Sequence, residues 1–494
     1  MRLTHAHFKM RIRCLLLVCL AVARSASAQV SAPSSEPDST QVAQNAQTPP
    51  PAIPESTPGN PDAGESSAGD SLTLFPHSDT SRYWISGQAN IILQWHPQFQ
   101  SKYIGINSLR SHAENATSKV YTLYLGYELT PTTEVFLDVE SAGGHGISNA
   151  LGLAGVTNLD VVRNTTLSQD PYIARLMLRQ IIPLDDERIE VERDDLHLAT
   201  SLPARRIEFR IGKFGLPDFV DLNTWGSDSH LQFLNWTSDN NGTYDYAANT
   251  RGYTDGVLVE YDDHWWSVRF VEALMPKVAN GVHLDADIAR ARSENLELEA
   301  RGKLIAHRDG TVRVLSYLNH ANMGNYREAI ADFLDGETST PDIIATRRQG
   351  RHKYGFGLNF EQEITSHVGL FGRLGWSDGR NESFAYTEDD RALELGGFTK
   401  GGLWHRGNDR VGTVFNMNGI VAAHQKYLAV GGLGFLLGDG ALTYGHEKIF
   451  EGFYTAHLWR GFFASFDLQH INNPGYNKAR GPVTVPALRF HVDF

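Results

Sequence analysis

The chain has 494 residues and a formal net charge of −13 at pH 7, and its two cysteines, Cys14 and Cys19, both lie near the N-terminus. Nucleic-acid binding draws its affinity from basic patches, so the acidic balance argues against a nucleic-acid partner. Beyond residue 19 the chain has no thiol, which excludes disulfides, thiolate metal sites and cysteine nucleophiles there.

Residues 1–28 contain the three parts of a secretory signal peptide. An apolar run at 14–23 is followed by the small-residue cleavage pattern Ala26-Ser27-Ala28. The run is too short for a membrane span, which needs about twenty apolar residues. The basic start comprises Arg2, Lys9, Arg11 and Arg13. We predict cleavage before Gln29, which removes five basic and no acidic residues and takes the net charge from −13 to −18.

Residues 29–80 are rich in Pro, Ser, Ala, Gln, Thr and Gly and have few large apolar side chains. Such a segment cannot bury enough apolar surface to fold, so we predict that it is disordered. We interpret it as a solvated tail, with a periplasmic tether as the alternative.

From residue 81 to 494 the composition shifts toward Gly, Phe, Tyr, Trp and Leu, without any apolar run of transmembrane-helix length. Apolar and polar residues instead alternate with a period of two, for example at 121–129, 135–140, 354–361 and 488–494. This pattern predicts an all-β fold, a transmembrane antiparallel β-barrel in the outer membrane. A soluble β-sandwich would also alternate, but Glu, Arg and Asp on successive polar faces favour the barrel.

The length of this domain predicts roughly 14 to 18 strands, a size at which the lumen holds water. The polar faces of the strands would line it. The inward candidates are Asp138, Glu140, Arg175, Arg179, Glu208, Arg210, Glu260, Arg269, Glu297, Glu299, Arg301, Arg313, Arg373, Asp467 and Arg489. Ion-selective filters use rings of one sign, whereas a mixed lining suits a neutral solute that is rich in hydroxyls. The simpler interpretation is that these charges only keep the lumen wall hydrated and bind no solute.

The stretch from Gly212 to Trp236 begins as a strand and then loses its alternation. Irregular backbone at membrane depth is tolerated only where it lines water or packs on protein. We therefore predict that this loop folds into the lumen. Its candidate sugar-binding residues are Asp221, Asn223, Trp225, Asn235 and Trp236, and the wall residues expected opposite are Arg175, Arg179, Arg269, Arg301, Arg313 and Arg373. The alternative is an external cover with both tryptophans buried in its own core.

Several long stretches resemble the carbohydrate-selective porins of the OprB type. They are residues 136–144, 152–160, 212–214 with 218–223, 232–236, 431–440 and 473–482. The resemblance implies a sixteen-stranded barrel with an inward-folded loop, an arginine-rich constriction and passage of monosaccharides. The N-terminal segment departs from the family because it does not resemble the surface-layer-homology and coiled-coil module of some relatives, so we infer no peptidoglycan attachment.

We therefore predict an outer-membrane porin for passive diffusion of small sugars, not an enzyme, with no cofactor and no metal. The expected partners are small neutral carbohydrates, outer-membrane lipid and the outer-membrane assembly machinery, and a homotrimer is left open. One alternative is a general or anion-selective porin. A less favoured one is a membrane-embedded β-barrel hydrolase, which would need a Ser/His or Asp/His constellation at one rim.

Overall fold

The computed structural model describes residues 72–161, 167–305 and 307–494, so the predicted signal peptide and nearly all of the predicted disordered segment lie outside the described residues. The described chain forms a closed antiparallel barrel of sixteen strands, and hydrogen bonds between β1 and β18 close it. A further two-stranded hairpin, β5–β6, lies between β4 and β7 along the chain. The predicted barrel is confirmed.

The wall strands are β1 (Tyr83–His96), β2 (Glu114–Thr130), β3 (Thr133–Gly144), β4 (Tyr172–Pro183), β7 (Arg206–Phe214), β8 (Thr254–Asp262), β9 (Trp266–Leu274), β10 (Arg292–Ile305), β11 (Arg308–Met323), β12 (Arg348–Thr365), β13 (Val368–Ser377), β14 (Arg391–Lys400), β15 (Arg410–Gly419), β16 (Glu447–Trp459), β17 (Phe462–Asn472) and β18 (Val483–Asp493). The hairpin strands are β5 (Arg188–Glu190) and β6 (Ser201–Pro203).

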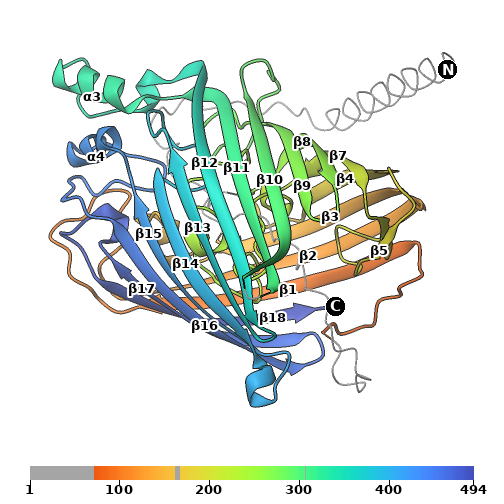
Figure 1. Ribbon diagram of the computed structural model, residues 1–494. Helices are drawn as coiled ribbons and strands as arrows, with labels where there is room; N and C mark the ends of the chain where they lie inside the picture. Colours follow the sequence, from red (N-terminus) through yellow and green to blue (C-terminus); the bar gives the residue numbers. More distant parts are fainter. Residues whose placement is uncertain (1–71, 162–166, 306) are drawn as a thin grey trace, which may run out of the picture. The chain divides into compact units, whose positions relative to one another are not determined.

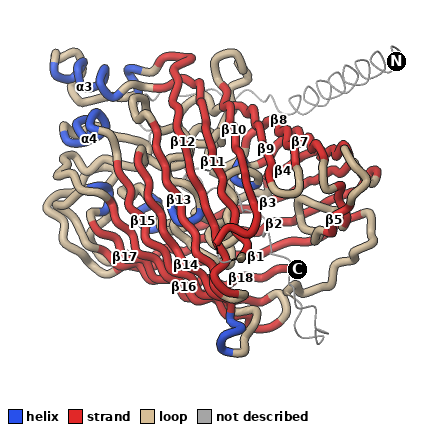
Figure 2. The backbone as a smooth tube through the Cα atoms, in the orientation of Figure 1, coloured by secondary structure: helices blue, strands red, loops and turns tan. Residues whose placement is uncertain are grey.

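The helical segments are short and belong to the connections between strands (Figure 2). They are α2 (Trp236–Asp239), α3 (Tyr326–Leu334), α4 (Ala422–Ala429), η1 (Ile147–Ala150), η2 (Leu216–Asp218), η3 (Ile344–Thr346), η4 (Gly401–Trp404) and η5 (Pro474–Tyr476). None of the helices in the described ranges is both long enough and apolar enough to cross a bilayer.

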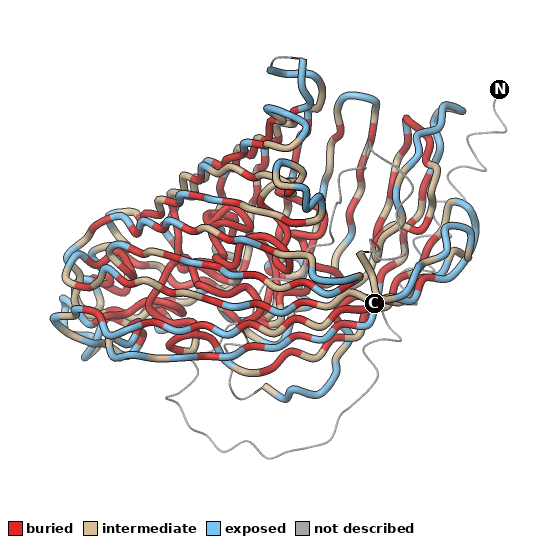
Figure 3. Tube along the Cα trace, turned by 90° about the horizontal axis from the view of Figure 1, so that it is seen from below, coloured by how far each residue is buried: buried red, intermediate tan, exposed pale blue. Residues whose placement is uncertain are grey.

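The strands form because the period-two pattern matches the two environments of a barrel wall. On β2, Tyr121 and Leu123 are exposed while Thr122 and Tyr124 are buried. Buried and exposed positions alternate in this way along the strands (Figure 3). The outward row can meet lipid, and the strand-to-strand hydrogen bonds satisfy the backbone, as a spanning structure requires.

The two ends of the barrel differ. Short turns join β2 to β3, β8 to β9 and β10 to β11 at the end that also carries the C-terminus, whereas α3 and α4 lie at the opposite end (Figure 1). In bacterial barrels the short turns are periplasmic and the long loops extracellular, which orients this barrel.

Three long extracellular connections fold into the lumen. Asn158, between β3 and β4, donates to the inward Ser118 of β2 (2.8 Å), and Asn241, between β7 and β8, donates to Leu374 O of β13 (3.0 Å). Between β13 and β14, Phe384 N donates to Asp245 of the β7–β8 connection (2.9 Å to Oδ2). The predicted inward-folded loop is therefore present, together with two further inward connections.

The last residue takes part in closing the barrel. Phe494 N donates to Gly87 O (2.9 Å), and Gly87 N donates to Phe494 O (2.7 Å). Deleting Phe494 or replacing it with Asp should lower the yield of assembled barrel about twofold or more, because the terminal strand loses pairing and apolar surface. The measurement is the fraction of outer-membrane protein that migrates faster unheated than boiled. Phe494→Tyr, which keeps the ring, is the control, and equal yields for all variants would contradict this role.

Candidate functional site: the charged lumen wall

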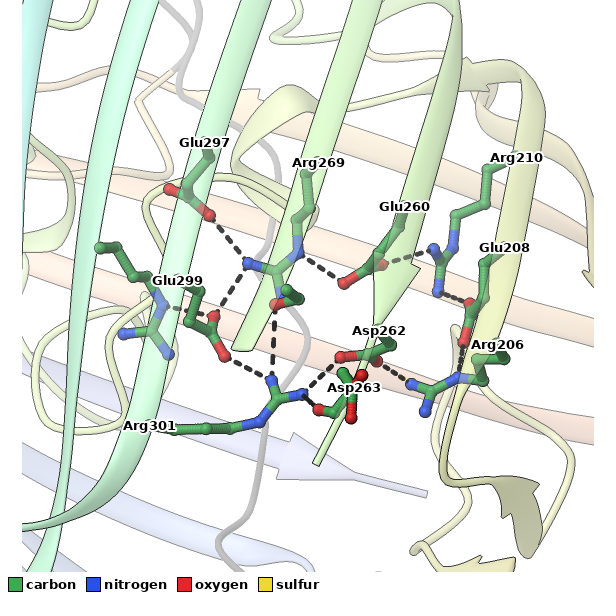
Figure 4. Close-up of polar contacts among 12 residues, drawn as sticks. Arg206, Glu208, Arg210, Glu260, Asp262, Asp263, Arg269, Glu297, Glu299 and Arg301 are labelled. Atoms are coloured by element: carbon green, nitrogen blue, oxygen red, sulfur yellow. Dashed lines mark hydrogen bonds and ion pairs between the residues drawn. The ribbon is translucent and has the colours of Figure 1, made fainter. Parts of the chain in front are cut away.

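Charged side chains form a continuous network on the inner face of one side of the barrel, which we call the charge ladder; Figure 4 shows its part from Arg206 to Arg301. Its members are Glu134, Arg179, Arg206, Glu208, Arg210, Glu260, Asp262, Arg269, Glu297, Glu299, Arg301, Arg313 and Glu361. They come from eight neighbouring strands of the wall: β3, β4, β7, β8, β9, β10, β11 and β12.

Strand register brings the opposite charges together. Arg269 on β9 lies directly across from Glu260 on β8 and from Glu297 on β10, and Arg313 on β11 lies across from Glu299 on β10. The N···O distances are 2.7 Å for Arg269–Glu260, 2.9 Å for Arg269–Glu297 and 2.9 Å for Arg313–Glu299. Opposite charges in such cross-strand pairs stabilise the pairing of their strands.

Four carboxylates of the ladder pair with more than one arginine: Glu208, Glu260, Asp262 and Glu299. Glu299 contacts Arg269 (2.9 Å), Arg313 (2.9 Å) and Arg301 (2.6 Å), and Arg301 also bonds to Asp262 on β8. Toward β4, Arg179 lies between Glu134 (2.9 Å) and Glu208 (2.8 Å). Buried ion pairs contribute little net stability, but they fix geometry because a lone buried charge is costly.

Water reaches only part of the ladder. The side chain of Arg301 is 33% exposed, and those of Arg269 and Arg313 are 11% and 10% exposed. Arg179 and Glu208 are buried almost completely. Arg301 on β10 is therefore the most accessible guanidinium of the ladder, and Arg269, Arg313 and, on β7, Arg206 (10%) are much less exposed.

The connection between β7 and β8, residues 215–253, is the inward loop. Arginines of the wall hold it by its acidic residues: Arg175 pairs with Asp218 (2.6 Å), and Arg410 with Asp228 (2.7 Å). Burial disfavours the charged form of Asp228, but Arg410, His230 and the Leu231 N–H outweigh it and lower the pKa of Asp228. The Asp228 anchor is therefore ionised at neutral pH.

Arg373 and Arg489 complete these anchors. Arg373 pairs with Asp221 (3.2 Å) in the loop and with Glu394 (2.9 Å) on β14. Arg489 donates to the carbonyl oxygens of Ser229 (2.8 Å) and Gln232 (2.6 Å). The loop is thus fastened to the wall at four arginines.

Wall carboxylates bind the loop through its backbone. Glu451 on β16 accepts from Leu234 N (2.6 Å), Asn235 N (3.1 Å) and Ser238 Oγ (2.6 Å). Glu297 accepts from Asp221 N (2.8 Å). Carboxylates facing the lumen therefore satisfy donors that an irregular loop would otherwise leave without partners.

The two tryptophans of the inward loop pack against protein. Trp236 is fully buried, stacks on Tyr386 with ring centroids 5.4 Å apart, and donates its Nε1–H to Asn158 O (2.9 Å). Trp225 is partly exposed and packs on Phe398 (centroids 5.2 Å). The loop is not the external cover of the alternative hypothesis, yet Trp236 is buried in a core as that hypothesis expected.

The predicted site residues divide into two groups. Those of the charge ladder are Arg179, Arg210, Glu260, Arg269, Glu299, Arg301 and Arg313, with Glu208 and Glu297 from the inward candidates. Those that hold or form the inward loop are Asp138, Glu140, Arg175, Asp221, Asn223, Trp225, Asn235, Trp236 and Arg373, with Arg489. Asp467, also an inward candidate, is buried beside Gln469. Arg175 and Arg373 bind the loop directly rather than facing it across open water.

Sequence reasoning missed Glu134, Arg206, Asp262 and Glu361 of the ladder and, among the residues that fasten the loop, Asp218, Asp228, Glu394, Arg410 and Glu451. Most of these occupy inward positions of strands, so a period-two count carried along every strand would have found them. Asp218 had no such signal because it lies in the irregular loop.

Across the described ranges, no group of three or more His, Cys, Asp and Glu residues is placed to hold a metal ion.

One protein-family model and several solved structures match this chain. The family model described as "Carbohydrate-selective porin, OprB family" matches residues 122–494. The high-pH structure of Pseudomonas putida OprB is similar with a TM-score of 0.64 at 14% identity, covering 83% of this chain and 94% of that one. Its low-pH structure has a TM-score of 0.44 at 11% identity, covering 83% and 92%. A loop-deletion mutant of OmpT from Vibrio cholerae has a TM-score of 0.42 at 10% identity, covering 84% and 100%. No curated protein matches the sequence.

Proposed function

Since the chain belongs to the OprB family of carbohydrate-selective porins, an outer-membrane channel family, we propose that small sugars cross it along the accessible part of the charge ladder on β9, β10 and β11. The observation that carries this proposal is the water-accessible guanidinium of Arg301, with the less exposed Arg269 and Arg313 beside it, each paired with carboxylates.

Paired charges suit a neutral solute. A sugar hydroxyl both donates and accepts, so it can take a hydrogen bond from an arginine and give one to the neighbouring glutamate. Arg301, for example, presents its guanidinium between Glu299 and Asp262. An anion would meet those carboxylates as well as the arginine, which favours the sugar over the anion-selective alternative.

The wall and the inward loop have separate tasks in this proposal. The loop packs on β13, β15 and β16 through Arg373, Arg410 and Glu451, and it also reaches the ladder at Glu297, so the ladder around Arg301 is the part left to the solute. Porin fold and family are those of non-enzymatic channels, and we propose that this chain has no catalytic activity.

Further partners follow from the outer surface. Outward side chains such as Leu296, Leu298 and Phe356 are exposed on the barrel wall, and we propose that outer-membrane lipid covers them. The terminal strand β18 would be recognised by the outer-membrane assembly machinery. A homotrimer stays a prediction.

The test is single-channel conductance of the purified protein in a planar bilayer, titrated with a monosaccharide and, separately, with phosphate. Sugar should reduce the ion current in a dose-dependent way. Arg301→Ala should raise the half-blocking sugar concentration about tenfold, because a hydrogen bond to a charged group is worth about 1.5–3 kcal/mol. Trp225→Ala should weaken block less, since that ring packs on Phe398.

The matched control is Arg308→Ala, which removes an exposed arginine from the first position of β11. It should leave sugar block unchanged. Block by phosphate but not by sugar would overturn the proposal in favour of an anion-selective porin, and an unchanged block in Arg301→Ala would remove the ladder as the sugar path.

A further inference from the structure

The connection between β4 and β7 is unlike the short turns that lie at the same end of the barrel. It spans residues 184–205 and contains the hairpin β5–β6, visible at that end in Figure 1. Residues 191–200 join the two hairpin strands and include a bridge between Asp194 and His197. We call residues 191–200 the exit loop.

The exit loop lies inside the barrel rather than below it. Leu196 and Leu198 are buried in the same apolar cluster as Trp84 and Phe136. Glu134, an inward residue of β3, accepts from Ala199 N (2.9 Å) and more weakly from Leu198 N (3.3 Å). Since Glu134 belongs to the charge ladder, the loop rests on the inner face of the wall from the periplasmic side.

A second contact fixes the start of the loop. Arg193 donates to Ser81 O (2.8 Å) and to Ser78 O, and its guanidinium lies 5.7 Å from the ring centroid of Trp84. With Leu198 packed at the other side, the loop is held at both ends. The exit loop is therefore fixed inside the lumen and is not a loose periplasmic turn.

The exit loop also reaches the inward loop. Arg175 pairs with Asp218 of the inward loop (2.6 Å) and lies 3.7 Å from Asp195 of the exit loop. Segments that enter from opposite ends of the barrel therefore meet at one buried guanidinium. Together they fill the lumen beside β3 and β4, which leaves the solute the side of the ladder.

His197 lies at the edge of the exit loop that faces the open part of the lumen. Its Nδ1 lies 2.9 Å from Asp194 Oδ1, and its Nε2 lies 3.3 Å from Nη2 of the ladder residue Arg210. The side chains of His197 and Asp194 are 32% and 26% exposed. The carboxylate and the guanidinium orient the imidazole from two sides, so the ring has a fixed position beside the ladder.

We propose that the exit loop sets the size limit of the channel on its periplasmic side, with His197 as the residue that borders the path. This inference rests on the proposed function for the position of the path along the ladder. It adds a second narrowing element to the extracellular inward loop, so a sugar must fit both in turn.

The test changes the size of residue 197 in both directions. His197→Trp should lower single-channel conductance and slow monosaccharide entry in liposome swelling, whereas His197→Ala should raise both. Replacing residues 191–200 by Asn-Gly, which suits a two-residue hairpin turn, should raise conductance on the order of twofold and admit disaccharides, because the narrowest part of a pore limits it. Heat-modifiable migration shows for each variant that the barrel has assembled.

The control is His264→Trp, a substitution at an exposed position of the β8–β9 turn at the same end of the barrel, which should change nothing. Equal conductance and equal disaccharide exclusion in the Trp, Ala and loop-replacement variants would overturn the inference. This result is distinguishable from failure of the proposed function, because block by monosaccharide and its weakening in Arg301→Ala would persist. Opposite shifts in the Trp and Ala variants would support the size limit.

Discussion

Arg373→Ala should destabilise the barrel by about 3–5 kcal/mol, the cost of breaking a buried ion pair from one side, and should loosen the inward loop. Arg373 is fully buried and pairs with Asp221 and Glu394. Its guanidinium also donates to Ser227 Oγ (2.5 Å). Removing it leaves the buried carboxyl group of Glu394 without its cationic partner and frees the loop at one of its four arginine anchors.

Two measurements check this outcome. The temperature at which the fast-migrating folded band disappears should fall, and the current through single channels should become noisier because the loop fluctuates. Arg308→Ala is the matched control, since that arginine is exposed at the start of β11. A folded band as heat-resistant as in the unaltered protein, with quiet channels, would show that Arg373 does not hold the loop.

Glu451→Ala should have an effect of similar size by a different route. One buried carboxylate accepts hydrogen bonds from Leu234 N, Asn235 N and Ser238 Oγ, and alanine leaves all three donors without it. Each unsatisfied buried donor costs about 1–3 kcal/mol. We expect lower thermal resistance and higher conductance, because the segment 234–238 would leave the wall.

Glu451→Gln provides the control because it keeps one acceptor oxygen in nearly the same place. It should retain most of the thermal resistance and of the sugar block. If the Gln variant behaved like the Ala variant, the charge of Glu451 and not its hydrogen bonds would be the stabilising feature.

The barrel itself could be predicted from the sequence because period-two alternation has a single physical cause, lipid outside and polar lumen inside. The same period identified inward residues such as Arg269, Glu299 and Arg313. It could not identify their partners, since those depend on the register between strands that are far apart in sequence. Arg313 on β11 and Glu361 on β12, for example, are 48 positions apart, and only the fold brings them together.

The irregular segments were harder for a related reason. Loss of alternation after Gly212 indicated an inward loop, but it could not show that Trp236 stacks on Tyr386, 150 positions further along the chain. The exit loop was missed altogether. Its charged residues are typical of a periplasmic turn, and the two buried leucines, Leu196 and Leu198, are too few to form a pattern.

The charge ladder also bears on how long a sugar stays in the channel. Every accessible guanidinium already has carboxylate partners, as Arg301 has in Glu299 and Asp262, so a visiting hydroxyl exchanges one hydrogen bond for another. Such an exchange gains less free energy than a hydrogen bond to an unpaired charge would, and the dwell time of a single molecule is correspondingly shorter. A channel conducts well when its sites bind strongly enough to fill and weakly enough to empty. Because its charges are already paired, the wall binds each sugar less tightly and releases it faster.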